Sequence, residues 1–174
     1  MFVCKLHYIF LMLKIGLLSD THAHVDKRML DILKECDEIW HAGDIGSLEV
    51  LKKLEETKPV RAVWGNIDGH EMRRAIPKEQ RFTIEGLDVY ITHIGGYPGK
   101  YDQEVKPLLR NNPPKLFICG HSHILRVMND PSLQMLYMNP GAAGKYGFHQ
   151  KRTMLLFDIE LGICKNLRVI EWEK

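Results

Sequence analysis

Apolar residues in the first half of the chain alternate between short continuous runs and stretches with a helical period. The short runs end at glycine, asparagine or other polar turn residues and predict buried β-strands over 13–18, 38–41 and 60–64. The periodic stretches predict helices over 26–36 and 47–56, with Asp26 and Ser47 as N-terminal caps. A strand–helix–strand–helix–strand order predicts right-handed parallel crossovers, whose loops gather at the carboxyl ends of the strands.

The second half of the chain shows paired short strands instead. The predicted strands are 81–84 with 87–93, 115–119, 125–128 with 135–138, and 153–160 with 164–171, and a helix is predicted over 102–111. We expect the apolar residues of the last two hairpins to be core. Parallel units followed by hairpins predict an α/β protein, a four-layer α/β/β/α sandwich of two mixed sheets flanked by helices.

The chain length of 174 residues suits a single domain, which we assign to residues 1–174. Residues 1–11 precede Met12 and are interpreted as an N-terminal extension; an additional strand or arm is the alternative. Lys5, His7 and Lys14 interrupt this apolar start, so it matches neither a membrane span nor a signal peptide. No membrane association is therefore predicted.

Charge and cysteine content exclude several classes of protein. Lys and Arg number 24 against 22 Asp and Glu, for a net charge of +2, whereas nucleic-acid binders usually carry a clear basic excess. The four cysteines are far apart and form no C-x-x-C pair, which excludes a zinc ribbon and favours the reducing cytoplasm.

Five segments share one pattern, in which a predicted strand ends and a polar side chain able to bind metal follows. They are Ser19-Asp20-Thr21-His22, Gly43-Asp44, Gly65-Asn66-Ile67-Asp68, Thr92-His93 and Gly120-His121-Ser122-His123. The carboxyl ends of parallel strands converge on one crevice, so these side chains are expected to meet. The glycines that precede the ligands permit close backbone approach in a crowded site.

The donor set comprises two aspartates, one asparagine and four histidines, with no thiolate. Such a mixture suits Mn²⁺, Fe or Zn²⁺. Seven groups exceed the requirement of one catalytic zinc but suffice for two ions bridged by a carboxylate. Asp44 is the natural bridge. Two carboxylates and a bridging hydroxide would leave the site positive, and such a site attracts a phosphate group.

These motifs, in this order, resemble those of the calcineurin-like metallophosphoesterase superfamily, and the short chain and the Asn139-Pro140-Gly141 segment resemble its small YfcE-type phosphodiesterase branch. The resemblance implies hydrolysis of a small phosphate ester, most readily a diester, by a metal-bridging hydroxide. It implies two divalent ions, with Mn²⁺ first and Ni²⁺, Zn²⁺, Fe or Mg²⁺ as alternatives. The first metal would be held by Asp20, His22, Asp44 and His123, and the second by Asp44, Asn66, His93 and His121. Asp44, Asn66, His22 and His93 would carry the catalytic roles.

One position departs from the family pattern. Many members carry G-N-H-D, whose histidine can act as a general acid, whereas this chain has Ile67. We therefore expect activity to depend on the pKa of the leaving group, because general acid help is worth roughly 10²–10⁴-fold. His24 and His70 are weaker candidates for the acid.

Several alternatives stay open. A scaffold or protein-binding module on the same fold is the rival to an enzyme, because the family contains the small retromer subunit with a degraded metal site. His41 is either an orienting partner of Asp44 or a packed strand residue. The basic residues Arg73, Arg74, Lys78 and Arg81 are interpreted as a solvated face, with contact to an anionic substrate as the alternative, and His7 and His149 are given no role. Hairpin edges and the apolar start would support a homodimer.

Overall fold

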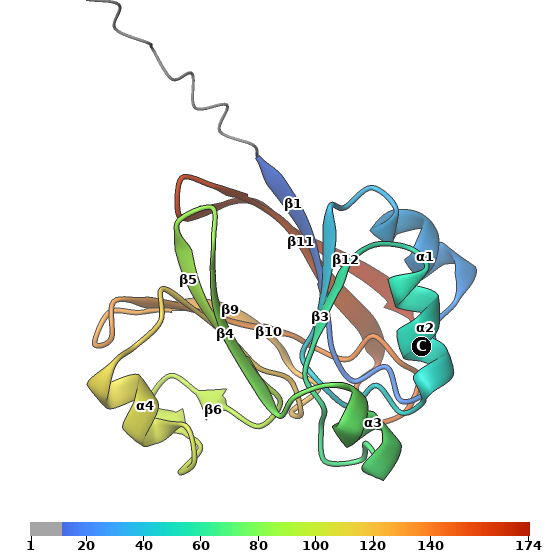
Figure 1. Cartoon of the computed structure of the whole chain (residues 1–174), viewed down its shortest axis with the longest axis horizontal. Helices are drawn as coiled ribbons and strands as arrows, with labels where there is room; N and C mark the ends of the chain where they lie inside the picture. Colours follow the sequence, from blue (N-terminus) through green and yellow to red (C-terminus); the bar gives the residue numbers. More distant parts are fainter. Residues whose placement is uncertain (1–11) are drawn as a thin grey trace, which may run out of the picture.

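A computed structural model describes residues 12–174 (Figure 1). The expected N-terminal extension, 1–11, and the interpretation of His7 lie outside the described residues. Among residues 12–174, no helix is long and apolar enough to cross a membrane. The described chain folds into two five-stranded mixed sheets that pack face to face, with helices on the outer faces (Figure 1).

The first sheet has parallel strands at its centre and one edge. Its spatial order is β12 (Ile163–Glu173), β11 (Lys151–Glu160), β1 (Leu13–Leu18), β2 (Glu38–His41) and β3 (Val60–Ala62). β1, β2 and β3 are mutually parallel, whereas β11 runs antiparallel to both β1 and β12. The carboxyl ends of three consecutive strands therefore lie along one edge of the sheet.

The second sheet repeats this arrangement with a parallel centre. Its order is β4 (Glu79–Ile84), β5 (Leu87–Thr92), β8 (Leu116–Ile118), β10 (Met135–Pro140) and β9 (Leu125–Asp130). β5, β8 and β10 are parallel, and the two edge strands are antiparallel to their neighbours. A separate short hairpin joins β6 (Gly96–Tyr97) to β7 (Lys100–Tyr101).

Because successive side chains point to opposite faces of each sheet, the apolar residues form three hydrophobic layers. In β1, Ile15 and Leu17 point between the two sheets, where they pack with Val89 and Ile118 of the second sheet. Leu18 points the opposite way, into the layer beneath α1 (Lys27–Leu33) and α2 (Leu48–Glu55). A third layer lies between the second sheet and α4 (Lys106–Asn111). The predicted four-layer α/β/β/α sandwich is thereby confirmed.

Both predicted helix caps form. Asp26 Oδ1 accepts a hydrogen bond from Met29 N at 3.0 Å, and Ser47 Oγ accepts one from Val50 N at 3.3 Å. The second oxygen of Asp26 pairs with the buried Arg152 at 2.9 Å, which ties the start of α1 to β11. α1 ends at Leu33, before the predicted end at residue 36, whereas α2 covers its predicted range apart from the cap residues Ser47 and Glu56.

Several local expectations were wrong. α3 (His70–Ala75) and the β6–β7 hairpin were not predicted, because each is too short to display a hydrophobic period. The helix expected over 102–111 begins only at Lys106. The last strand is core only in part: Ile163 is 57% exposed and Val169 46%, whereas Trp172 is buried in the layer beneath α1. β12 is an edge strand of the first sheet, and most of its apolar side chains are therefore only partly covered.

The closest packing in the first sheet is at Gly16, which lies beneath α1. A Cβ atom at this position would come within 2.4 Å of Leu33 Cδ2 and 3.2 Å of Cys36 Sγ, and both side chains are fully buried. We expect Gly16→Ala to lower the free energy of unfolding by about 1–3 kcal/mol, the usual cost of overpacking a core. Chemical denaturation would measure it.

Gly69→Ala is the matched control, because a Cβ atom there would meet nothing within 4 Å. Equal stability of Gly16→Ala and the wild type would show that α1 is free to move away from the sheet.

Candidate metal centre

The chain leaves its strands at the site in a backbone conformation that side-chain-bearing residues rarely adopt. Asp20, His22, Asp44, His121 and His123 all have positive φ angles, between 45° and 66°. Each such residue costs on the order of 1 kcal/mol or more unless its surroundings impose it. Five of the seven predicted ligands thus carry backbone strain, and each ligand side chain is turned out of the strand into the crevice.

Hydrogen bonds between neighbouring loops hold this strained backbone in place. The N–H groups of Asp20, His22 and Ala23 donate to the carbonyls of Gly43, Asp44 and Ile45 at 2.8–3.0 Å. The backbone N–H of His121, from the second sheet, donates to Asp20 Oδ2 at 3.1 Å. The loops after β1, β2 and β8 therefore form one continuous hydrogen-bonded unit.

The first ligand cluster contains Asp20, His22 and His123, whose donor atoms lie within 4.8 Å of one another. His123 Nε2 lies 3.1 Å from His22 Nε2 and 3.2 Å from Asp20 Oδ1. Asp20 is fully buried, yet its Oδ1 accepts no hydrogen bond. A buried carboxylate oxygen without a donor is costly unless a cation neutralises it.

The second cluster contains Asp44, His93 and His121, likewise within 4.8 Å, with Asn66 beside them. His93 Nε2 lies 3.2 Å from Asp44 Oδ1 and 3.1 Å from Asn66 Oδ1. Asp44 faces both clusters, because its Oδ2 lies 3.8 Å from His22 Nε2. All seven predicted side chains thus lie close together, in two neighbouring groups.

The hydrogen bonding of His93 bears on what fills the second cluster. Its Nδ1 lies 2.8 Å from the carbonyl oxygen of Ala42, which can only accept, so Nδ1 carries a proton. In the neutral ring, Nε2 then directs a lone pair at the oxygens of Asp44 and Asn66. That arrangement is repulsive unless a proton or a metal ion lies between the three atoms, so the residues fit a bound cation.

Local electrostatics favour the metal-binding forms of Asp44 and His22, whereas the contact with Asp44 favours protonation of His93. Burial alone would raise the pKa of Asp44, but hydrogen bonds from His93 and from the N–H of Ile67 outweigh it and lower the pKa. Burial lowers the pKa of His22 despite the nearby carboxylates, which favours the neutral ring. Burial also opposes protonation of His93, yet its hydrogen bond to Asp44 raises the pKa overall.

Asp68, the last residue of the G-N-x-D motif, joins two of the loops that carry candidate ligands. It is buried, and its two oxygens accept hydrogen bonds from the N–H groups of Gly46 at 2.7 Å, Gly65 at 2.8 Å and Ile45 at 3.2 Å. It thereby fastens the loop that carries Asp44 to the loop that carries Asn66. Three charge-assisted hydrogen bonds to one carboxylate form a strong local anchor.

His41 also anchors the loops. Its Nδ1 accepts from Gly43 N at 3.2 Å, so its Nε2 donates to Thr21 Oγ1 at 2.9 Å. Complete burial lowers its pKa to about 4, which keeps the ring neutral. Of the two interpretations of His41, the structure favours positioning of the backbone just before Asp44.

Two glycines permit the close approach of these loops. A Cβ atom at Gly65 would lie 2.0 Å from Asp44 Oδ1, and one at Gly120 would lie 1.9 Å from Ser19 Oγ. Neither contact is physically allowed, so any larger residue would displace a ligand loop. The role that the sequence suggested for these glycines is confirmed.

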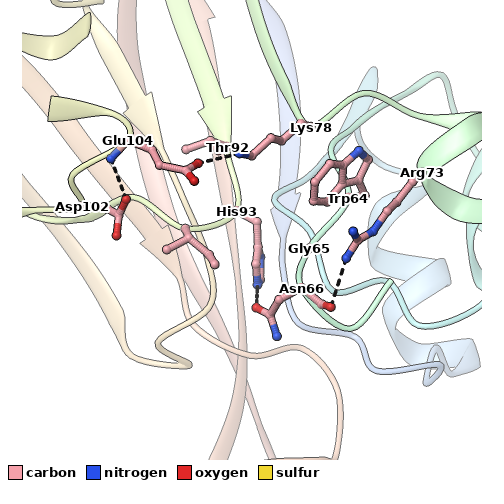
Figure 2. Close-up of a pocket in the computed structure, with 10 residues that line it drawn as sticks. Trp64, Gly65, Asn66, Arg73, Lys78, Thr92, His93, Asp102 and Glu104 are labelled. Atoms are coloured by element: carbon pink, nitrogen blue, oxygen red, sulfur yellow. Dashed lines mark hydrogen bonds and ion pairs between the residues drawn. The ribbon is translucent and has the colours of Figure 1, made fainter. Parts of the chain in front are cut away.

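A cavity of about 240 Å³ lies beside the second cluster (Figure 2). We name it the charged cavity; Arg73, Lys78, Asp102 and Glu104 line it together with Trp64. The Arg73 guanidinium lies 4.4 Å from the centre of the Trp64 ring and donates to the carbonyl oxygen of Asn66. Arg73 and Lys78 therefore border the site, whereas Arg81 pairs with Asp88 at the surface.

A second cavity, of about 450 Å³, opens beside the first cluster. We name it the apolar cavity; Ile67, Ile124, Tyr146 and Phe148 line it together with metal-binding candidates. His149 also lines it, with its ring centre 5.3 Å from that of His123, so a histidine to which the sequence assigned no role lies beside the site. The 144–149 loop carries no sequence motif, and only the fold brings it to the site.

Neither weaker candidate for the general acid reaches these cavities. His24 lies beside Asp26 at 3.4 Å, and His70 is exposed at the start of α3. Neither lines the charged or the apolar cavity in the described part of the chain.

Comparisons with known proteins agree with this geometry. The model of the calcineurin-like phosphoesterase superfamily domain matches residues 13–162. A probable metallophosphoesterase of Methanothermobacter thermautotrophicus is 32% identical over 135 residues, covering 74% of this chain and 76% of the relative. A phosphodiesterase of Methanocaldococcus jannaschii is 28% identical over 150 residues, covering 77% and 86%.

Solved structures show the same likeness. An archaeal phosphodiesterase superposes with a TM-score of 0.74 at 25% identity, covering 91% of this chain and 99% of that chain. Vps29 of Entamoeba histolytica complexed with zinc superposes with a TM-score of 0.67 at 16% identity, covering 92% and 98%. The second likeness shows the fold alone.

The anchoring role of Asp68 can be tested without touching a candidate ligand. We expect Asp68→Asn to lower the free energy of unfolding by about 2–4 kcal/mol, because an amide nitrogen would face backbone donors. Metal affinity should fall roughly 10–100-fold, as for other residues that orient ligands. Thermal unfolding and calorimetric Mn²⁺ titration measure the two effects.

Glu71→Gln, an exposed carboxylate on α3, is the control and should change neither quantity. Unaltered metal binding in Asp68→Asn would mean that the two loops hold their positions without this anchor.

Proposed function

The chain belongs to the calcineurin-like phosphoesterase superfamily, and from this premise we propose that it hydrolyses phosphodiesters at a centre of two divalent metal ions. The position of Asp44 carries the proposal. One of its oxygens lies 3.2 Å from His93 and the other 3.8 Å from His22, so it presents one oxygen to each cluster. A carboxylate placed in this way is suited to bridge two ions.

The ligand sets we propose follow the two clusters. Asp20, His22, Asp44 and His123 would hold the first ion, and Asp44, Asn66, His93 and His121 the second. Nitrogen and oxygen donors without thiolate support Mn²⁺ as the first choice. Bound here, divalent ions would polarise the phosphoryl oxygens and lower the pKa of a water molecule that serves as the nucleophile.

The residues of the chain orient the reacting groups. The Nδ1–H of His93 is fixed by the carbonyl of Ala42 at 2.8 Å, which sets the orientation of the ring toward Asp44 and Asn66. His22 is packed between the His123 ring and the Tyr146 ring, at 5.1 and 5.3 Å. Such restraint supports the catalytic roles proposed for His22, His93, Asn66 and Asp44, because little reorganisation would accompany the reaction.

We place the protein in the cytoplasm. Cys36, Cys119 and Cys164 are free thiols, and burial raises the pKa of Cys36 to about 11. Unpaired, unreactive thiols support a reducing compartment.

The scaffold alternative has one observation in its favour, the exposed apolar side chain of Ile67 at the mouth of the site. A bulky apolar group in this position is compatible with protein binding as well as with catalysis. Turnover by metal-loaded protein separates the two functions, and its absence with Mn²⁺ present would favour the scaffold.

The bridging role of Asp44 predicts a linked loss of metal and activity. Asp44→Asn should bind fewer than two ions per chain and lose on the order of 10²–10³-fold in phosphodiesterase activity, because each ion is worth several kcal/mol in the transition state. Elemental analysis and kinetics with bis-p-nitrophenyl phosphate measure this, after reconstitution with Mn²⁺, Ni²⁺, Zn²⁺ or Mg²⁺. Asp31→Asn, an exposed carboxylate paired with Lys27 and Lys34, is the control.

If Asp44→Asn retained both ions and full activity, the bridging role would be wrong.

The apolar side chain at position 67 predicts a steep dependence of rate on the leaving group. Ile67 cannot donate a proton, so aryl diesters should be hydrolysed and alkyl diesters poorly. A series of aryl methyl phosphates with phenols of increasing pKa should show rates that fall steeply with that pKa. Ile67→His should flatten the dependence and raise the slowest rates by roughly 10²-fold or more.

Ile67→Leu keeps the apolar side chain and should behave as the wild type. Equal rates for aryl and alkyl leaving groups in the wild type would show that another residue supplies the proton.

A further inference from the structure

Large apolar side chains gather at one side of the metal centre. Ile67 is 46% exposed, Ile124 57%, Tyr146 72% and Phe148 105%, and all four line the apolar cavity. Phe148 is fully exposed in the described part of the chain, so its aromatic surface contributes little to the packing there. Exposed apolar groups clustered around a site usually mark where a ligand or partner binds.

The loop that presents the two aromatic rings is held firmly. Gly144 N donates to the carbonyl of Asp20 at 3.0 Å, and the His149 ring bonds the carbonyl of Gly144 at 2.9 Å. Gly147 has a φ of +126°, and a Cβ atom there would come within 2.2 Å of His123 Nδ1. The backbone at Gly147 therefore packs closely against the candidate ligand His123, and Tyr146 and Phe148 are the residues before and after Gly147 in the chain.

The residues that line the cavity determine which chemical groups can bind in it. His22, Asp44, Asn66 and His123 form part of its lining, so whatever occupies it lies next to the metal centre. No lysine or arginine lines it among residues 12–174, in contrast to the charged cavity on the other side of Asn66. A second phosphate or carboxylate would find no countercharge there, whereas an uncharged flat group could stack on the exposed rings.

We propose that the apolar cavity is a subsite for an uncharged aromatic substituent on the phosphate ester, with Tyr146 and Phe148 as its binding residues. This inference rests on the proposed phosphodiesterase function, because binding of the phosphoryl group at the metal centre would place its substituent in the cavity. The cavity's continuity with the metal-binding residues favours the substrate itself over a separate partner. The natural substrate is then a phosphodiester with an aromatic group on at least one ester arm.

Binding of two phosphonates to the Mn²⁺-loaded full-length protein tests the subsite without requiring turnover. Phenylphosphonate and methylphosphonate share the group that binds metal and differ in the substituent. By calorimetry, the wild type should bind phenylphosphonate roughly 10-fold more tightly. Phe148→Ala should reduce this ratio by about 3- to 10-fold, the usual worth of an aromatic contact, and Phe148→Leu should reduce it less.

Ile163→Ala removes an exposed apolar side chain on β12 that does not line the cavity, and it should leave the ratio unchanged. A wild-type ratio near one, or a ratio that Phe148→Ala does not alter, overturns the subsite while leaving phosphodiester hydrolysis intact. Absence of binding by either phosphonate would instead overturn the proposed function, and the subsite with it. Concentration-dependent dimerisation abolished by Phe148→Ala, together with a ratio near one, would assign the surface to a second copy of the chain.

Discussion

Everything at this site depends on how the backbone leaves the parallel strands. Asp20, Asp44 and His121 each follow a strand end in the left-handed conformation, which turns their side chains toward the crevice between the two sheets. Such a conformation is unfavourable for any residue with a Cβ atom, so it persists only where neighbouring hydrogen bonds impose it. The loops after β1 and β2 supply these bonds by donating and accepting across the crevice edge. The fold and the site are therefore a single cooperative structure.

Two residues outside the candidate ligand set, Asp68 and His41, hold these loops in place. Asp68 collects three backbone N–H groups, and His41 connects Gly43 to Thr21 through a ring that burial keeps neutral. Their contacts explain why the ligand loops can be strained and still well defined. Preorganisation of this kind is what electrostatic catalysis requires, because the chain does not need to reorganise as charge develops.

The surroundings of the centre are asymmetric. On one side Arg73 and Lys78 border a small charged cavity, and on the other Tyr146 and Phe148 border a larger apolar one. A phosphodiester has two arms, and these two environments would treat them differently. The candidate metal ligands lie where the cavities meet, since Asn66 lines both. Under the proposed function, chemistry at phosphorus and choice of substituent would be separable properties.

The sequence by itself determined the strands of the two large sheets, the two helix caps, the four-layer sandwich and the seven polar residues grouped at strand ends. The strands and helices could be predicted because their hydrophobic periods are local properties of the chain. The seven polar residues could be found because the five motifs follow one another in a recognisable order. Only the tertiary structure decided that Arg73, Tyr146, Phe148 and His149 border the site, that Asp68 anchors two loops, and that β12 lies at the edge of the first sheet. Those features depend on which distant loops meet and on which strand lies at an edge, and neither leaves a periodic signal in the chain.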